Sequence, residues 1–106
     1  MRGSEILVDN KKIGKGFEPF IIAEMSGNHN HSLENALDIV QCAADSGVDA
    51  IKLQTYTPDT ITLDVDSKDF VINDPKSIWK GKKLYDLYNL AYTPWEWHEP
   101  IMEKAK

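Results

Sequence analysis

Two short strand-like segments separated by one amphipathic segment constrain this chain more than any other feature. The first, at 19–24, is a near-continuous apolar run that ends in a carboxylate, and the second occupies 49–55. Between them, Ser32 is a good helix N-cap, apolar residues recur at helical spacing up to Ala44, and Gly47 is placed to end the helix. A strand, a helix of about four turns and a second strand form a βαβ unit, so we expect parallel strands and a right-handed crossover.

Two parallel strands need more neighbours than this chain supplies, because parallel sheets are covered by helices on both faces. The 106 residues otherwise hold a leading hairpin, which we place at 1–18, and a long polar insertion at 56–93. The hairpin turn falls at Asp9 and Asn10, which tolerate left-handed backbone. We therefore expect 19–106 to be an incomplete part of a larger α/β domain.

The last part of the sequence predicts two helices. Helical spacing returns between Leu84 and Ala91. Thr93, Pro94 and Glu96 then match a capping box with proline at the first helical position. Because Pro100 lacks an N–H and clashes with the preceding turn, we expect it to kink the final helix.

Charge and composition narrow the class of protein. With 12 basic and 17 acidic residues the net charge is −5, which argues against non-specific binding to nucleic-acid backbone. No apolar run approaches the roughly 20 residues that cross a bilayer. The single cysteine, Cys42, lies on the predicted polar helix face without an activating neighbour and suits a reducing compartment. We expect a cytoplasmic protein with neither nucleic acid nor membrane as a partner.

Glu24 and Lys52 are the residues best placed for chemistry. Glu24 ends the first apolar run, and ligands bind at the carboxyl ends of strands in α/β folds, so it is a candidate acid/base or substrate-orienting group. The alternative is a carboxylate that simply faces water. Strand alternation puts Lys52 on one face with Ala50 and Gln54. A lysine there needs an anionic partner, either Glu24 or a bound phosphate or carboxylate group, and we favour the bound anion.

Two further groups of residues each have more than one interpretation from the sequence alone. His29 and His31 lack a third ligand at metal spacing, so we favour loop shaping or hydrogen bonding to substrate over a metal site. Between 79 and 97 lie 6 of the 10 Phe, Trp and Tyr residues. These aromatic residues either pack a helical core or, with nearby lysines, frame a sugar site.

The stretches 20–30 and 47–55 together resemble the start of the sialic acid synthase family, and 78–98 resembles its pseudaminic acid synthase branch. Members of this family use phosphoenolpyruvate to make nonulosonic acids. The resemblance implies a (β/α)₈ TIM barrel of about 250 residues, of which this chain holds the leading hairpin and the first two strand–helix units.

The resemblance also implies roles for individual residues. The carboxylate matching Glu24 lies beside the reacting carbon of phosphoenolpyruvate and is the expected catalytic group, and the lysine matching Lys52 helps to bind that substrate. The other substrate-binding residues expected at the same mouth or in the insertion are Gln54, Asn28, His29, Trp79 and Lys80.

The implied reaction joins C3 of phosphoenolpyruvate to the aldehyde of an N-acetylated amino sugar, after which water adds at C2 and phosphate leaves. The resemblance implies a divalent metal, Mn or Mg, whose ligands are not in this chain, a homodimer for the full-length enzyme, and no activity for these residues alone. An N-acetylneuraminate or legionaminate synthase is the alternative within the family. Outside it, the alternatives are an aldolase that uses Lys52 as a Schiff base and an inactive barrel piece with only a structural or interaction role.

Overall fold

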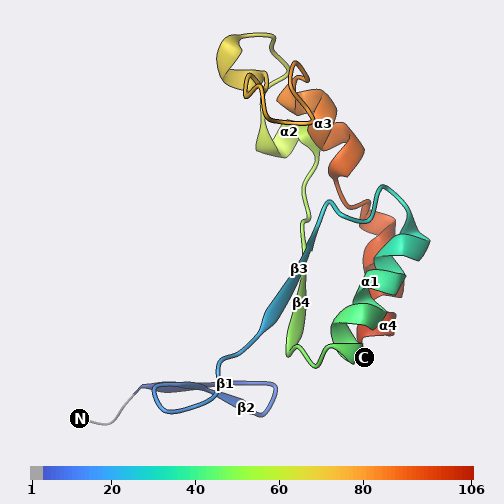
Figure 1. Ribbon diagram of the computed structural model, residues 1–106. Helices are drawn as coiled ribbons and strands as arrows, with labels where there is room; N and C mark the ends of the chain where they lie inside the picture. The colour runs from blue at the N-terminus through green and yellow to red at the C-terminus, as the bar shows by residue number, and fades with distance from the viewer. Residues whose placement is uncertain (1–3) are drawn as a thin grey trace.

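Two parallel strands joined by one helix form the centre of the chain (Figure 1). β3 (Ile22–Ser26) pairs in parallel with β4 (Ala50–Leu53), and α1 (Leu33–Asp45) connects them. The apolar face of α1 packs on one side of this two-stranded sheet. The predicted βαβ unit is therefore present.

The first strand begins later than its apolar run, which spans 19–24. Pro19 has no N–H to donate to a sheet ladder. The N–H of Ile21 is used instead by the side chain of Asp49, at 2.7 Å from Oδ2. The ladder consequently starts at Ile22 rather than at 19.

The second strand is shorter than the predicted strand, which spans 49–55. The register shifts between Glu24 and Ser26, both of which lie on the neighbouring strand, and Leu53 is the last paired residue. A bulge of this kind interrupts ladder pairing. Gln54 therefore lies just beyond the carboxyl end of β4 rather than within it.

The two ends of α1 are capped as the sequence predicts. The side chain of Ser32 accepts a hydrogen bond from the backbone N–H of Asn35 at 3.3 Å. At the other end, Ser46 is the C-cap and Gly47 follows with a φ of 80°, the left-handed conformation that glycine adopts without penalty.

The last helix completes the core. α3 (Leu84–Ala91) is followed by a short 3₁₀ helix, η2 (Trp95–Trp97), and then by α4 (His98–Ala105), which packs on α1 (Figure 1). The core cluster consists of four buried side chains: Met25, Ala36, Val40 and Ile101.

Two predictions for this last segment are wrong. The capping box does not form, because Thr93 is buried and its hydroxyl contacts His29, while Pro94 precedes η2 without a side-chain cap. The predicted kink at Pro100 is also not required, because Pro100 breaks no hydrogen bond within the final helix. Since α4 begins at His98, Pro100 lies in the first turn, where backbone N–H groups have no partner inside the helix.

The insertion folds into short helices beyond the carboxyl ends of β3 and β4 (Figure 1). α2 (Pro58–Ile61) packs against α3, and a 3₁₀ turn, η1 (Lys68–Phe70), lies between them in sequence. The Lys83 ammonium lies 2.7 Å from Asp64 and 3.6 Å from Asp66, which raises the pKa of Lys83. Ion pairs therefore link the segment after α2 to the start of α3 within the insertion.

The hairpin lies at the opposite, amino-terminal end of the strands (Figure 1). The structure describes residues 4–106, so the first three residues of the predicted hairpin segment lie outside it. β1 (Glu5–Val8) and β2 (Lys11–Gly14) pair antiparallel. Asp9 and Asn10 form the turn with φ values of 44° and 68°, as these residue types allow.

The described chain is open in shape. Its radius of gyration is 17.7 Å, whereas a compact chain of this length has about 13 Å. Its accessible surface is 7991 Å², against about 6,000 Å² for a compact protein of this mass. Mixed α/β structure with two small sheets and excess surface is consistent with part of a barrel. Among residues 4–106, no helix is long and apolar enough to span a membrane.

Candidate active site

Glu24 and Lys52 face each other across the parallel sheet. They are direct partners in the ladder between β3 and β4, so their side chains leave the same face. Met25 and Leu53, which alternate with them, pack on the opposite side against the core of α1 and α4. The Lys52 Nζ lies 2.8 Å from Oε1 of Glu24. Both charged groups therefore lie on the face of the sheet away from α1 and α4, and Lys52 follows the side-chain alternation predicted for its strand.

This ion pair is open to solvent. The side chain of Lys52 is 62% exposed and that of Glu24 is 57% exposed. Exposed ion pairs contribute about 1 kcal/mol or less to folding, because water screens both charges. Glu24 is the anionic partner that Lys52 has in this structure, and a weak, exposed pair leaves Lys52 accessible to a bound anion.

A small hollow surrounds the pair at the strand ends. Its volume is about 60 Å³, and Glu24, Ser26, Lys52, Leu53 and Gln54 line it. Ser26 has a φ of 51° at the bulge, so the chain turns away from the sheet directly after Glu24. The structure therefore brings together three of the residues that the sequence predicts for a site, namely Glu24, Lys52 and Gln54.

The loop after β3 holds itself together through its polar side chains. Asn28 donates from Nδ2 to the carbonyl of Met25 at 2.9 Å. His29 is fully buried, and its Nδ1 accepts the backbone N–H of His31 at 3.0 Å. Its Nε2 lies 3.2 Å from Oγ1 of Thr93. Because Nδ1 is an acceptor, the neutral ring carries its proton on Nε2 and donates it to Thr93.

This position fits one of the two roles considered for His29. Burial lowers the pKa of His29, and the neighbouring His31 lowers it further, so the ring is kept neutral. Nδ1 is occupied within the loop and Nε2 by Thr93, which leaves neither for a substrate in this conformation. The geometry favours loop shaping, and a role of His29 in binding substrate stays a prediction.

The two insertion residues expected at the substrate are not brought to Glu24 and Lys52. Trp79 and Lys80 lie on a turn between η1 and α3, and the part of the insertion that contains them extends away from the strands (Figure 1). Trp79 is 47% exposed. Their role in binding an amino sugar remains a prediction.

The aromatic residues between 79 and 97 mostly pack against other rings. Tyr88 meets Tyr56 edge to face at 5.5 Å, and Trp97 meets His29 at 5.0 Å. Trp79 remains exposed. Helix and loop packing therefore accounts for much of this group.

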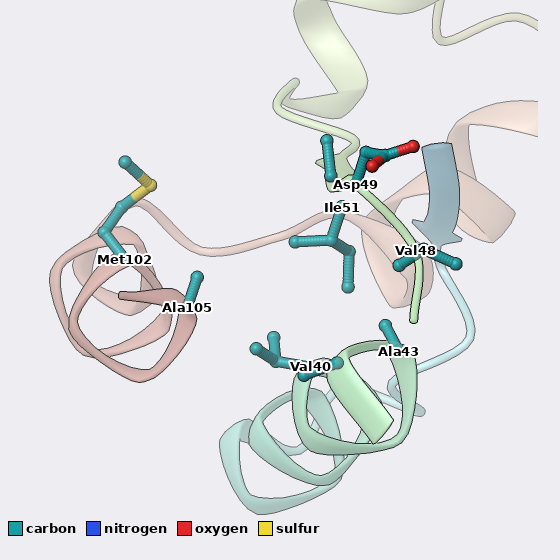
Figure 2. Close-up of a pocket in the computed structure, with 9 residues that line it drawn as sticks. Val40, Ala43, Val48, Asp49, Ile51, Met102 and Ala105 are labelled. Carbon is teal, nitrogen blue, oxygen red and sulfur yellow. The ribbon is translucent and has the colours of Figure 1, made fainter. Parts of the chain in front are cut away.

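A larger hollow lies elsewhere and has different chemistry. It has a volume of about 300 Å³ between α1, β4 and α4, and Figure 2 shows its largely apolar lining. The residues that Figure 2 labels are Val40, Ala43, Val48, Asp49, Ile51, Met102 and Ala105. Asp49 is the charged residue in the lining, and its carboxylate already binds Lys11 and the N–H of Ile21. The larger hollow is therefore suited to packing rather than to catalysis.

A complete metal site is not found among residues 4–106. No group of three or more His, Cys, Asp or Glu side chains lies close enough there to hold a metal ion. His29 and His31 do not serve as a ligand pair, because Nδ1 of His29 accepts the N–H of His31 and its Nε2 carries the proton donated to Thr93. The residues that the structure describes do not fit a divalent metal by themselves.

The fold and site define an α/β protein whose adjacent parallel strands present a lysine and a carboxylate at their carboxyl ends, where such folds bind ligands. Comparison with known proteins identifies the family. Residues 39–106 match the NeuB family, and the chain belongs to it.

The relatives agree with this assignment. The chain is 53% identical over 87 residues to a pseudaminic acid synthase of Campylobacter jejuni, covering 82% of this chain and 25% of the relative. It is 42% identical over 88 residues to a pseudaminic acid synthase of Helicobacter pylori, covering 83% of this chain and 25% of the relative. The chain thus spans about a quarter of the length of these curated relatives.

A solved structure is also similar. The crystal structure of the spore coat polysaccharide biosynthesis protein SpsE from Bacillus subtilis matches with a TM-score of 0.59 and 27% identity, covering 95% of this chain and 24% of that one. Together the comparisons confirm the resemblance to the sialic acid synthase family and support a synthase-type enzyme at family level.

Proposed function

We propose that this chain is the amino-terminal part of a (β/α)₈ barrel enzyme that condenses phosphoenolpyruvate with an N-acetylated amino-sugar aldehyde, as a pseudaminic acid synthase does. The observation that carries the proposal is the facing pair of Glu24 and Lys52, at the carboxyl ends of adjacent parallel strands. This pair lies in a chain that is 53% identical to a pseudaminic acid synthase over most of its length.

In the proposed reaction Lys52 binds an anionic group of phosphoenolpyruvate. An ammonium group forms a short, charge-assisted hydrogen bond with a phosphate or carboxylate oxygen. Glu24, released from Lys52 by that anion, then lies beside the substrate as an acid/base or orienting group. Gln54, in the same hollow, offers an amide that can both donate to and accept from a sugar hydroxyl.

The proposed reaction forms one carbon–carbon bond and releases phosphate. C3 of phosphoenolpyruvate forms a bond to the aldehyde carbon, and the aldehyde oxygen takes up a proton. Water adds at C2, loses a proton, and the C2–O bond to phosphate breaks. The products are a nine-carbon 2-keto acid and inorganic phosphate when the sugar has six carbons.

Three further features of the whole enzyme belong to the proposal. The enzyme uses a divalent metal, Mn or Mg, whose ligands lie outside this chain. The enzyme works as a homodimer. It acts in the cytoplasm, where phosphoenolpyruvate is made, and uses neither nucleic acid nor membrane as a partner.

An aldolase that uses Lys52 as a Schiff base is less well supported. A Schiff base requires a neutral amine, which buried lysines attain by desolvation. Lys52 is exposed and paired with a carboxylate at 2.8 Å, and so does not lie in a desolvated pocket of that kind. Borohydride trapping with a carbonyl substrate distinguishes the two, because the proposed reaction forms no covalent adduct with lysine.

The direct test uses the longest gene product that contains these residues. It is incubated with phosphoenolpyruvate and either a 2,4-diacetamido-trideoxy hexose or N-acetylmannosamine, and phosphate release and the keto-acid product are measured. We expect product with the diacetamido sugar. Product from N-acetylmannosamine instead indicates an N-acetylneuraminate synthase, and phosphate release with neither sugar contradicts a sugar-condensing function.

A further inference from the structure

The segment 93–98, which leads into α4, contacts the loops that follow both β3 and β4. Oγ1 of Thr93 lies 3.2 Å from Nε2 of His29 in the loop after β3. Nε2 of His98 lies 2.7 Å from Oγ1 of Thr55, two residues beyond the end of β4. One short segment is thus bonded to each strand-end loop through a histidine–threonine pair.

Each of these bonds has a fixed direction. Nδ1 of His29 accepts the N–H of His31, so its Nε2 donates to Thr93. Nδ1 of His98 lies 3.0 Å from the carbonyl of Trp95, and because a carbonyl only accepts, Nδ1 carries the proton. In a neutral His98 ring, Nε2 therefore accepts from Thr55. In neutral rings, the two histidines hold opposite tautomers, each determined by a backbone group.

The two pairs differ in burial. His29 and Thr93 are almost completely buried, and Trp97 lies edge to face with His29 at 5.0 Å. This buried pair is costly to break, because each partner is left without a hydrogen bond. The contact between His98 and Thr55 is exposed, and Trp95 stacks on His98 with ring centroids 5.4 Å apart.

The loop after β3 also approaches the end of α3 closely. A Cβ added at Gly27 lies 3.0 Å from Cβ and 3.1 Å from the carbonyl oxygen of Ala91. A side chain at this position forces one of the two segments to move. The loop between Ser26 and His29 is therefore seated on the same stretch of chain that supplies Thr93.

We propose that Thr93 and His98 are positioning residues that hold the two strand-end loops around the Glu24–Lys52 pair. This inference rests on the function proposed above. The loop that Thr93 holds directly follows Ser26, and Thr55, which His98 holds, directly follows Gln54. Both Ser26 and Gln54 line the hollow with Glu24. Neither Thr93 nor His98 lines that hollow, so they act through these neighbours and not on the substrate.

The test compares hydroxyl removal with hydroxyl retention in the longest gene product that contains these residues. Thr93→Val keeps the size of the side chain and removes the acceptor, whereas Thr93→Ser keeps it. A displacement of about 1 Å at a reacting centre costs up to about a hundredfold in rate. We expect kcat to fall about tenfold or more in Thr93→Val and to recover in Thr93→Ser.

A second pair of variants tests the other contact in the same way. Thr55→Val removes the hydroxyl that faces His98, and Thr55→Ser keeps it. The control is Ser46→Ala at the exposed end of α1, where the hydroxyl bonds only Cys42, and its kcat should be unchanged. If Thr93→Val lowers the melting temperature but keeps the wild-type kcat, Thr93 is purely structural and the proposal is overturned.

An activity-independent measurement separates this proposal from the proposed function. In NMR spectra, the backbone amide signals of Ser26 and Asn28 should shift in Thr93→Val and return in Thr93→Ser, and His29 should show a proton on Nε2. If the wild-type protein releases no phosphate, the proposed function fails, but these signals still test whether Thr93 positions the loop after β3. Unchanged signals in Thr93→Val contradict the positioning role of Thr93, whether or not the protein releases phosphate.

Discussion

His29 illustrates how burial fixes the protonation of a single side chain. Its pKa is lowered by burial and by His31, so the folded ring binds a proton less readily than the unfolded ring. The stabilisation from neutral His29 is therefore complete above the unfolded value of about 6.5 and is lost as the pH falls below it.

The lowered pKa of His29 predicts that the stability of the protein falls at acidic pH. Between pH 8 and pH 5, the melting temperature of the wild-type protein should fall more steeply than that of His29→Gln, which has no titrating group at this position. Differential scanning calorimetry in matched buffers measures both profiles. Parallel profiles would show that His29 does not couple protonation to folding.

At the residue scale, the sequence predicted the strand-end position of Glu24 and the strand face of Lys52, because both are local properties of a strand. It could not predict Thr93 as the partner of His29, since 64 positions separate them. The motif from Thr93 to Glu96 is a good local capping signal. In the fold, however, the Thr93 hydroxyl is buried and contacts His29 instead of capping a helix. Long-range contacts of this kind leave no trace in local spacing.

At the scale of elements, Asp49 connects the leading hairpin to the βαβ unit. Its carboxylate accepts the N–H of Ile21 at 2.7 Å and binds the Lys11 ammonium at 2.6 Å. The hydrogen bond from Ile21, and then that from Lys11, lower the pKa of Asp49. The stabilisation from this contact is therefore fully present above the ordinary carboxyl pKa and is lost as the pH falls to the lowered pKa of Asp49.

We expect Lys11→Met to loosen the hairpin while leaving the βαβ unit folded. Limited proteolysis should then cleave more rapidly between 14 and 21, which links β2 to β3. Lys12→Met is the matched control, because Lys12 pairs only within the hairpin, at 3.5 Å from Glu5. Equal cleavage of the Lys11 and Lys12 variants would mean that Asp49 does not hold the hairpin.

The elements differ in how far the sequence determines them. α1 was predicted together with both caps, because Ser32 and Gly47 act on adjacent backbone. The start of β3 at Ile22 was not, because it depends on the side chain of a residue 28 positions away. Local chemistry determines where the helix ends, and pairing partners determine where the strands end.

At the scale of the whole molecule, the open face of the sheet limits stability. Ile22 lies on the same face as Glu24 and is half exposed, and the accessible surface of 7991 Å² exceeds by about a third what a compact protein of this mass exposes. Burial of apolar surface is the main driving force for folding. The 106 residues alone should therefore unfold over a broad temperature range.

Circular dichroism during heating tests this expectation. The longest gene product that contains these residues should melt in a sharp, cooperative transition, whereas the 106-residue chain should not. A sharp transition of the short chain as a monomer would contradict the view that its sheet needs further neighbours.

The most direct test of the central claim measures phosphoenolpyruvate binding and turnover separately in the longest gene product. Loss of a hydrogen bond to a charged group costs about 1.5–3 kcal/mol, so Lys52→Met should weaken phosphoenolpyruvate binding at least about tenfold in calorimetric titration. Glu24→Gln should bind phosphoenolpyruvate as tightly as the wild type and release almost no phosphate in the presence of the amino sugar. Unchanged turnover in Glu24→Gln, or unchanged binding in Lys52→Met, would contradict the assignment of this pair as the active site.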